Sequence, residues 1–348
     1  MKSSVCALGS LTAIAALALL SGCSAIAVSP NVVSASGARP AKAAMQSIYA
    51  FAPDKPLLAV YARRVLPVTG PTSLLEGPKT QLSTGNGMAV DSDGKIYFVV
   101  YQNFSRSPLK LLVFAANAHG DVAPERTAIL EGPLLAGYSV GLALDGRGNF
   151  WITAIGKLLR YPASARGSAK PNASIALQLQ TPKGLMAANS SNVAVDSAGN
   201  VYCSCTVVFQ GAQAIGVSEY SLRPRHRVKL VRSFYDFNLP EVPPASIAVD
   251  GAGTIYLASS LPNTGVFAYA AGTKSGNVPY TRRFVTGSGT MISSLTTDAA
   301  GKVYVAAASQ IMVFGSHANG YVRPIRSIDD PTHLRYTTST YGTLLNVR

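Results

Sequence analysis

The stretch GMAVDSDGKIYFVV (87–100) recurs along the chain, and this recurrence decides the fold. The other copies are GLALDGRGNFWITA (141–154), NVAVDSAGNVYCSC (192–205), SIAVDGAGTIYLAS (246–259) and SLTTDAAGKVYVAA (294–307). Measured between the Asp residues that follow the first apolar run, the spacings are 54, 51, 54 and 48 residues. An internal repeat of this length indicates a fold built from similar units.

Each copy has the pattern of a β-hairpin. A short apolar run precedes Asp, Gly stands three residues after that Asp, and an aromatic residue stands three residues after the Gly. Asp suits the first position of a tight turn, and Gly can adopt the left-handed backbone that the turn needs. A calcium loop would need further oxygen ligands and a distal Glu. We therefore assign a structural turn role to Asp91, Gly94, Asp145, Gly148, Asp196, Gly199, Asp250, Gly253, Asp298 and Gly301.

A second pattern follows each hairpin, with an apolar strand, a turn, a Pro and another short strand. Gly stands four residues before the Pro at Gly120, Gly167 and Gly320, and three residues before it at Gly276. One copy, EYSLRPRHRVKLVRSF (219–234), has basic residues in place of the Gly turn. Four strands in each unit of about 50 residues are typical of a β-propeller blade.

We predict an all-β chain that folds as a six-bladed β-propeller of four-stranded antiparallel blades. The residues two positions before each Asp are small, as crowded innermost strands require: Ala89, Ala143, Ala194, Ala248 and Thr296. Residues 46–77 have the pattern of three outer strands, and residues 338–348 add one strand. The first blade is therefore expected to be closed by the C-terminal strand, and five blades are the alternative.

The N-terminus has the features of a secretory signal. An apolar run from Val5 to Leu20 ends in Leu20-Ser21-Gly22-Cys23, which resembles the lipobox of bacterial lipoproteins. We predict a lipoprotein signal peptide at 1–22, a lipidated Cys23 with a flexible tether at 23–44, and one propeller domain at 45–348. An ordinary secretory signal is the alternative. The resemblance implies a lipid-anchored protein of the bacterial cell envelope, in the outer membrane and facing the periplasm or the surface.

The charge of the chain bears on its partners. The sequence has 30 Lys and Arg against 16 Asp and Glu, with a formal net charge of +14. The basic stretch RPRHRVKLVR (223–232) is interpreted as a solvated surface or as a contact with anionic head groups. No nucleic-acid module is visible, so nucleic acid is excluded as a partner. We expect a monomer that meets the membrane through its lipid and binds a glycan, a peptide or an envelope protein.

The D-x-x-G-x-[IV]-[YW] hairpins resemble the NHL-repeat and gluconolactonase-like six-bladed propellers. We call the second pattern, a strand followed by a turn, a Pro and another strand, the Gly-Pro module. The pairing of the hairpin with this module resembles NHL-type propeller lipoproteins. The resemblance covers residues 46–348. It implies a divalent metal at the channel mouth, held by Glu, Asn and Asp of the inner strands. Asn192 lies in the matching column and Asn86 lies one residue from it, whereas no acid does. We therefore expect no catalytic residue and no cofactor. A divalent metal is expected only under the alternative, a metal-dependent, lactonase-like hydrolase.

The channel mouth, where the inner strands begin, is the default binding surface of a propeller. The loop FYDFNLPEVPP (234–244) is rich in aromatic and acidic residues, although it can also serve only to cover the ring. We predict a non-enzymatic binding or scaffold module. Its predicted ligand contacts are Asn86, Asn192, Ser246, Ser294, Tyr101, Asn103, Tyr235, Asp236, Asn238 and Glu241.

Cys203 and Cys205 are the part of the third copy that the repeat does not explain. They stand two residues apart on one predicted strand and therefore share a face. Apolar packing is the favoured interpretation. A disulfide or a metal site is the alternative, and a metal would need two further ligands.

Overall fold

The computed structural model describes residues 47–52, 55–63, 70–83, 85–101, 108–132, 141–209, 211–222, 228–240, 244–259, 261, 265–285, 287, 291–334 and 344–347. Ala44–Arg348 cluster as one compact unit. The predicted signal peptide, tether and Cys23 lie outside the described residues. Within the described residues, the chain has no helix with the length and apolarity needed to span a membrane.

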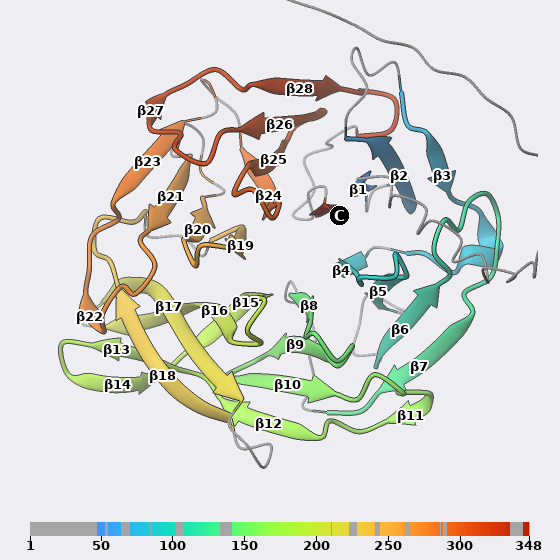
Figure 1. Cartoon of the computed structure of the whole chain (residues 1–348). Coiled ribbons are helices and arrows are strands. Elements are labelled where there is room, and N and C mark those ends of the chain that lie inside the picture. Colours follow the sequence, from blue (N-terminus) through green and yellow to red (C-terminus); the bar gives the residue numbers. More distant parts are fainter. Residues whose placement is uncertain are drawn as a thin grey trace, which may run out of the picture. The chain divides into compact units, whose positions relative to one another are not determined.

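The strands form six mainly antiparallel sheets, the blades, around a common axis (Figure 1). From the innermost strand outward, blade 1 is β29 (Leu344–Val347), β1 (Ser47–Ala52), β2 (Leu57–Ala62) and β3 (Ser73–Leu75). Blade 2 is β4 (Gly85–Val90), β5 (Ile96–Tyr101), β6 (Leu109–Phe114) and β7 (Arg126–Leu130). Blade 3 is β8 (Leu142–Leu144), β9 (Phe150–Ala154), β10 (Lys157–Tyr161) and β12 (Ala173–Ala176).

The other three blades follow the same order. Blade 4 is β15 (Asn189–Val195), β16 (Val201–Phe209), β17 (Ala212–Leu222) and β18 (Val228–Tyr235). Blade 5 is β19 (Ser246–Val249), β20 (Ile255–Ala258), β21 (Val266–Tyr269) and β23 (Arg282–Val285). Blade 6 is β24 (Ile292–Thr297), β25 (Val303–Ala307), β26 (Gln310–Phe314) and β28 (Arg326–Asp329). A 3₁₀ turn, η1 (Pro78–Thr80), and a hairpin of β13 (Gln178–Thr181) and β14 (Gly184–Ala187) lie between blades.

The ring is closed by both ends of the chain. β29 pairs antiparallel with β1, with Ala50 opposite Leu345. The innermost strands then contact one another in the order β4, β8, β15, β19, β24, β29 and back to β4. The predicted six blades and the closure by the C-terminal strand are confirmed, and the five-bladed alternative is wrong.

The Gly-Pro module does more than make a turn. Gly167–Ala169 (β11), Gly276–Asn277 (β22) and Gly320–Tyr321 (β27) each pair in parallel with the outermost strand of the preceding blade. Gly120 makes an isolated bridge of the same kind with Leu75. These short strands cover edges that would otherwise expose unpaired backbone groups, and they link neighbouring blades.

Arginine side chains provide a second link between blades. Arg282, on the outermost strand of blade 5, donates from Nη1 to the carbonyl oxygens of Ser316 at 2.7 Å and Ala318 at 3.2 Å in blade 6. The same link to the next blade is made by Arg126, Arg232 and Arg326. A guanidinium group can donate to two carbonyl oxygens at once. These Arg side chains therefore connect an outer strand to the next blade.

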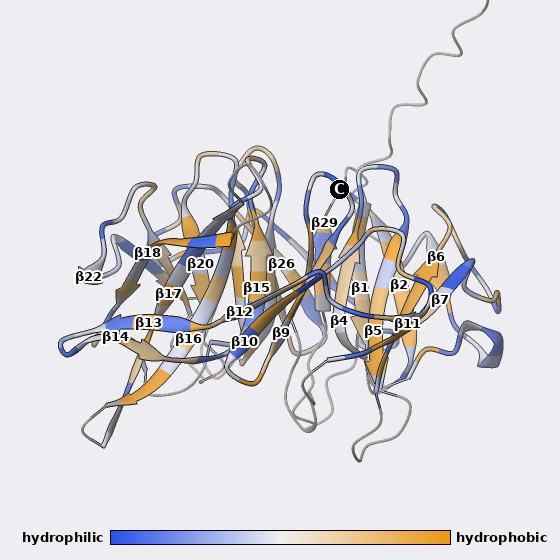
Figure 2. Ribbon diagram, turned by 90° about the horizontal axis from the view of Figure 1, so that it is seen from below, coloured by the Kyte–Doolittle hydropathy of each residue, from blue (hydrophilic) through white to orange (hydrophobic). Residues whose placement is uncertain are grey.

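Apolar side chains fill the space between adjacent blades. One cluster joins Ile48 and Ala50 of blade 1 to Ile311 and Val313 of blade 6. In the side view of Figure 2, apolar residues concentrate on the strands rather than in the connecting loops. Because each core is shared by two blades, the ring positions its loops as one rigid unit.

Candidate functional site

The propeller has two faces, which the strand directions define. We call the face on which the innermost strands begin the mouth face, and the face that carries the Asp-Gly turns the turn face. Among the described predicted contacts, Ser246, Tyr101 and Tyr235 lie at mouth-face ends of β19, β5 and β18, and Asp236 and Asn238 lie in the loop after β18. Asn192 and Ser294 lie within the inner strands β15 and β24. Asn103 and Glu241 lie outside the described residues, and for Asn86 the structure describes only a backbone position in β4.

Three predicted contacts near the channel link neighbouring inner strands. Asn192 Nδ2 donates to the carbonyl oxygen of Pro244 at 2.9 Å. The hydroxyl of Ser246 donates to the carbonyl oxygen of Leu295 at 3.2 Å. The backbone N–H of Leu345 donates to the hydroxyl of Ser294 at 3.2 Å. These polar groups hold blades 4, 5, 6 and 1 together at the mouth, and their contact with a ligand stays a prediction.

The loop after β18 has one buried side and one exposed side. Tyr235 is buried, and its ring meets that of Phe237 edge to face with 4.9 Å between ring centroids. Phe237 is 50% exposed, and Asn238 is also exposed. Tyr101, at the mouth-face end of β5, is half-buried, and its carbonyl oxygen accepts a bond from the Ser83 hydroxyl. The loop therefore presents an aromatic and an amide side chain to solvent.

Asp236 in the same loop is enclosed by the protein, with 1% of its surface exposed. Oδ1 accepts bonds from the N–H and the Nδ2 of Asn238 at 2.8 and 2.9 Å. Oδ2 accepts bonds from the Tyr269 hydroxyl at 3.0 Å and the Tyr280 N–H at 2.9 Å, both in blade 5. Burial, followed by the nearby Asp236 charge, raises the pKa of Tyr269. These bonds favour a structural role for Asp236, whereas its predicted contact with a ligand stays a prediction.

Four of the five turn aspartates, Asp91, Asp196, Asp250 and Asp298, accept a bond from the tyrosine hydroxyl of their own hairpin. In the fourth copy, Asp250 Oδ1 accepts the N–H groups of Ala252 and Thr254 at 2.9 Å, and Oδ2 accepts the Tyr256 hydroxyl at 3.1 Å. The equivalent hydroxyl bonds join Tyr97 to Asp91, Tyr202 to Asp196 and Tyr304 to Asp298. The turn glycines have positive φ angles, namely Gly94, Gly148, Gly199, Gly253 and Gly301. In these four copies the carboxylates therefore cap their own turns and bind the strand aromatics.

The second copy has Trp151 in place of Tyr and satisfies its aspartate differently. Asn149 Nδ2 donates to Asp145 Oδ2 at 3.0 Å, and Arg160 Nε lies 3.6 Å from the same oxygen. The Arg160 guanidinium also stacks over the Trp151 ring at 5.7 Å from its centroid. Asn149 thus supplies the hydrogen bond that the tyrosine hydroxyl supplies in the other copies, and the buried Arg160 adds an ion pair.

Cys203 and Cys205 are both fully buried and free, in an apolar cluster with Trp151 and Leu179. Burial raises the pKa of the Cys205 thiol to about 12 and raises that of Cys203 well above its ordinary value. Both thiols are therefore protonated at neutral pH, and the structure shows apolar packing with no disulfide between them.

We expect both thiols to resist a maleimide in the native domain, because the reactive thiolate is scarce and the side chains are out of reach. In denaturant they should react at once. Labelling of the native and unfolded domain (residues 45–348), read by mass spectrometry, measures this difference. Rapid labelling of the native domain without loss of melting temperature would contradict it.

Apolar side chains gather on the mouth face. Five of the large hydrophobic residues that the structure leaves exposed lie there, on blades 3 to 6: Ile155, Val208, Phe237, Leu261 and Met291. Val208, near the tip of the long β16–β17 hairpin, is 72% exposed. Single exposed apolar residues are normal on protein surfaces, and their presence on four consecutive blades makes this face the candidate contact surface.

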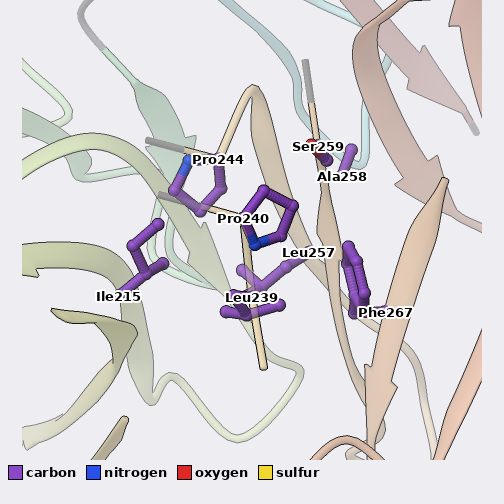
Figure 3. A pocket seen from close by; sticks show the side chains of 8 residues that line it. All are labelled: Ile215, Leu239, Pro240, Pro244, Leu257, Ala258, Ser259 and Phe267. Atoms are coloured by element: carbon purple, nitrogen blue, oxygen red, sulfur yellow. The ribbon is translucent and has the colours of Figure 1, made fainter. Parts of the chain in front are cut away.

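A shallow hollow lies between blades 4 and 5 on this face (Figure 3). Its lining is mainly apolar and consists of Ile215, Leu239, Pro240, Pro244, Leu257, Ala258, Ser259 and Phe267. The space that it offers is about 10 Å³, roughly that of one water molecule. Sites for small molecules span roughly 300 to 1,000 Å³, so this hollow does not have the size of a substrate pocket.

The positions of possible metal ligands bear on the lactonase-like alternative. Within the part of the chain that the structure describes, no three His, Cys, Asp or Glu side chains gather as a metal site. Several of the described acids already have structural partners, in a turn as at Asp250 or between blades as at Asp236. The residues described at the mouth therefore do not fit a carboxylate-bound metal.

The chain matches no protein-family model, and a search of curated proteins finds no significant match. Among solved structures, it is similar to a “putative 6-phosphogluconolactonase” from Bacteroides fragilis, at 13% identity and a TM-score of 0.51, with 85% of each chain covered. A protein of unknown function from Bacteroides caccae is 11% identical, with a TM-score of 0.51, 86% of this chain and 98% of that chain covered. A “putative gluconolactonase” is 13% identical with a TM-score of 0.41, and 68% of this chain and 75% of that chain are covered. At these identities, the likeness to the first two structures shows a shared propeller fold and nothing about function. The TM-score of the third structure is too low to support an argument.

Proposed function

We propose that this chain is an envelope-anchored propeller that binds another polypeptide through its mouth face without catalysing a reaction. The exposed apolar side chains on the mouth-face loops of four consecutive blades support this proposal. Polar groups near the channel are used between blades, as at Asn192 and Ser246, which leaves apolar contact as the main attraction. A peptide or an envelope protein therefore fits this face better than a glycan. Lipidation of Cys23 and the outer-membrane location belong to the same proposal.

The domain (residues 45–348) with Phe237→Ser is expected to bind a peptide array at least about tenfold more weakly than the unchanged domain, because aromatic anchors dominate such contacts. Tyr321→Ser is the matched control. That residue is 87% exposed, but it lies on β27 at the outer edge of blade 5. Equal binding by all three proteins, or an equal loss in both variants, would contradict a binding site on the mouth face.

A metal-dependent hydrolase at the same face is the second candidate. The name of the Bacteroides fragilis neighbour favours it, although its likeness to this chain concerns the fold. Metal analysis of the purified domain separates the two candidates. Stoichiometric calcium or zinc that disappears with Asn192→Ala would overturn the non-enzymatic proposal, whereas metal below stoichiometry in both proteins would support it.

A further inference from the structure

The turn face carries exposed basic side chains on four consecutive blades, 3 to 6. Two of them lie in Asp-Gly turns, two lie in the loops that follow third strands, and one lies near the start of β18: Arg147, Lys302, Arg166, Lys274 and Lys229. Within the part of the chain that the structure describes, none of these five side chains has an acidic partner. Residues 223–227 of the basic stretch lie outside that part. Five cations without a neutralising carboxylate are therefore in contact with solvent on this face.

The acids of the same four blades do not balance these surface charges. No acid that the structure describes near the turn face of blades 3 to 6 is exposed, namely Asp145, Asp196, Glu219, Asp250 and Asp298. Three of them form ion pairs with other arginines, which are Arg160, Arg232 and Arg63. In blade 2, by contrast, Asp93 and Glu125 are exposed, and Glu125 pairs with Lys95. The turn face of blades 3 to 6 is therefore a positively charged surface.

The mouth face has a different chemistry. Exposed charges of both signs lie there, such as Lys157 at the start of β10 and Asp329 at the end of β28. The exposed apolar side chains of blades 3 to 6, such as Phe237, lie on this face as well. The two faces of the ring therefore suit two different partners, one that offers apolar contacts and one that is anionic.

The chain enters the ring at the turn face. The inner strand β29 ends there, and β1 pairs antiparallel with β29, so β1 begins at the turn face with Ser47. Cys23 stands 24 residues before Ser47. A flexible chain of that length has an end-to-end distance of about 27 Å. An anchor at Cys23 would therefore leave the domain from the positively charged face and favour the approach of that face to the membrane.

We propose that the turn face docks on anionic lipid head groups and thereby turns the mouth face away from the membrane. This inference rests on the anchoring in the proposed function and deepens it, because it leaves the mouth face open to the partner polypeptide. Each cation close to an anionic membrane strengthens the attraction about fivefold. Arg147 and Lys302 belong to blades 3 and 6, which lie opposite each other in the ring (Figure 1). Contact through the whole face engages both, whereas contact through one edge engages only one of them.

The test uses the domain (residues 45–348), which lacks Cys23, so that the contact of the turn face is measured apart from any lipid. We expect the domain to co-sediment with vesicles of equal parts phosphatidylglycerol and phosphatidylcholine, and to bind vesicles of phosphatidylcholine alone at least about tenfold more weakly. The double variant Arg147→Gln with Lys302→Gln should bind the anionic vesicles at least about tenfold more weakly. Lys55→Gln with Lys157→Gln is the matched control, since it removes the same charge from exposed positions on the mouth face. It should keep the full binding, and melting temperatures check that both double variants are folded.

The outcomes separate this inference from the binding function. Equal binding to both kinds of vesicle, absence of binding to both, or an equal loss in the two double variants would overturn the docking of the turn face. Binding to dextran sulfate without binding to the anionic vesicles would also overturn it, because that result assigns the face to an anionic polysaccharide. Phe237→Ser should bind the anionic vesicles as the unchanged domain does. A failure of peptide binding at the mouth face would therefore leave the vesicle result standing, and the reverse holds as well.

Discussion

Replacing Gly265 with alanine is expected to lower the free energy of unfolding by about 4 kcal/mol, because it combines strained backbone with a steric clash. Gly265 has φ +85°, a conformation that favours glycine, and it precedes β21. An added Cβ would lie 2.1 Å from the carbonyl oxygen of Phe284 on the adjacent strand. The neighbour is backbone, so it cannot rotate away. Thermal unfolding should show a decrease in melting temperature on the order of 10 °C.

Two other glycines separate the strain from the clash. Gly272 has φ +75° with nothing within 4 Å of an added Cβ, so Gly272→Ala tests the backbone strain alone. Gly216 occupies the position of Gly265 in blade 4, since GVSEY (216–220) corresponds to GVFAY (265–269). Its added Cβ would meet the Phe234 carbonyl oxygen at 1.9 Å, and its φ is not positive. If Gly265→Ala unfolded at the same temperature as Gly272→Ala, the close approach of the two strands would be refuted.

The blade architecture could be predicted from sequence because it depends on local patterns that recur. The Asp-Gly turn and the small residue two positions before the Asp are both local to one hairpin. Their recurrence in five copies identifies the repeating blade. The links between blades were missed, although a signal exists. Arg126 and Arg326 each stand two residues after the Pro of their module. Their carbonyl partners lie in the next blade, at a distance that a repeat pattern does not encode.

The candidate site was predictable only as a location. The column four residues before each Asp lies on the inner strands, and it selected Asn192, Ser246 and Ser294. Whether such a side chain faces a ligand or the next inner strand depends on the separation of neighbouring blades, which the sequence does not specify. The structure shows that these three groups bond across blades. The exposed apolar residues were missed because Val208 and Met291 look like ordinary strand residues in sequence.

Asp236→Ala is expected to lower the free energy of unfolding by about 4 kcal/mol, since it leaves two buried donors without an acceptor. These donors are the Tyr269 hydroxyl and the Tyr280 N–H of blade 5. Asn238→Ala is the comparison in the same loop, because it removes one donor to Asp236 Oδ1 and keeps the bonds of Oδ2 to blade 5, and it should cost about 1 kcal/mol. Chemical denaturation of the domain measures both values.

A double-mutant cycle with Tyr269→Phe decides whether Asp236 acts through this tyrosine. In that background Asp236→Ala no longer leaves a hydroxyl unpaired, so its cost should be smaller by about 1 to 2 kcal/mol. Strictly additive costs would refute the coupling between blades 4 and 5.

The result of the cycle also decides how binding data for these variants are interpreted. A loss of binding in Asp236→Ala would follow from loosening of the mouth face as readily as from a lost contact, whereas Phe237→Ser changes an exposed side chain and reports on the contact itself.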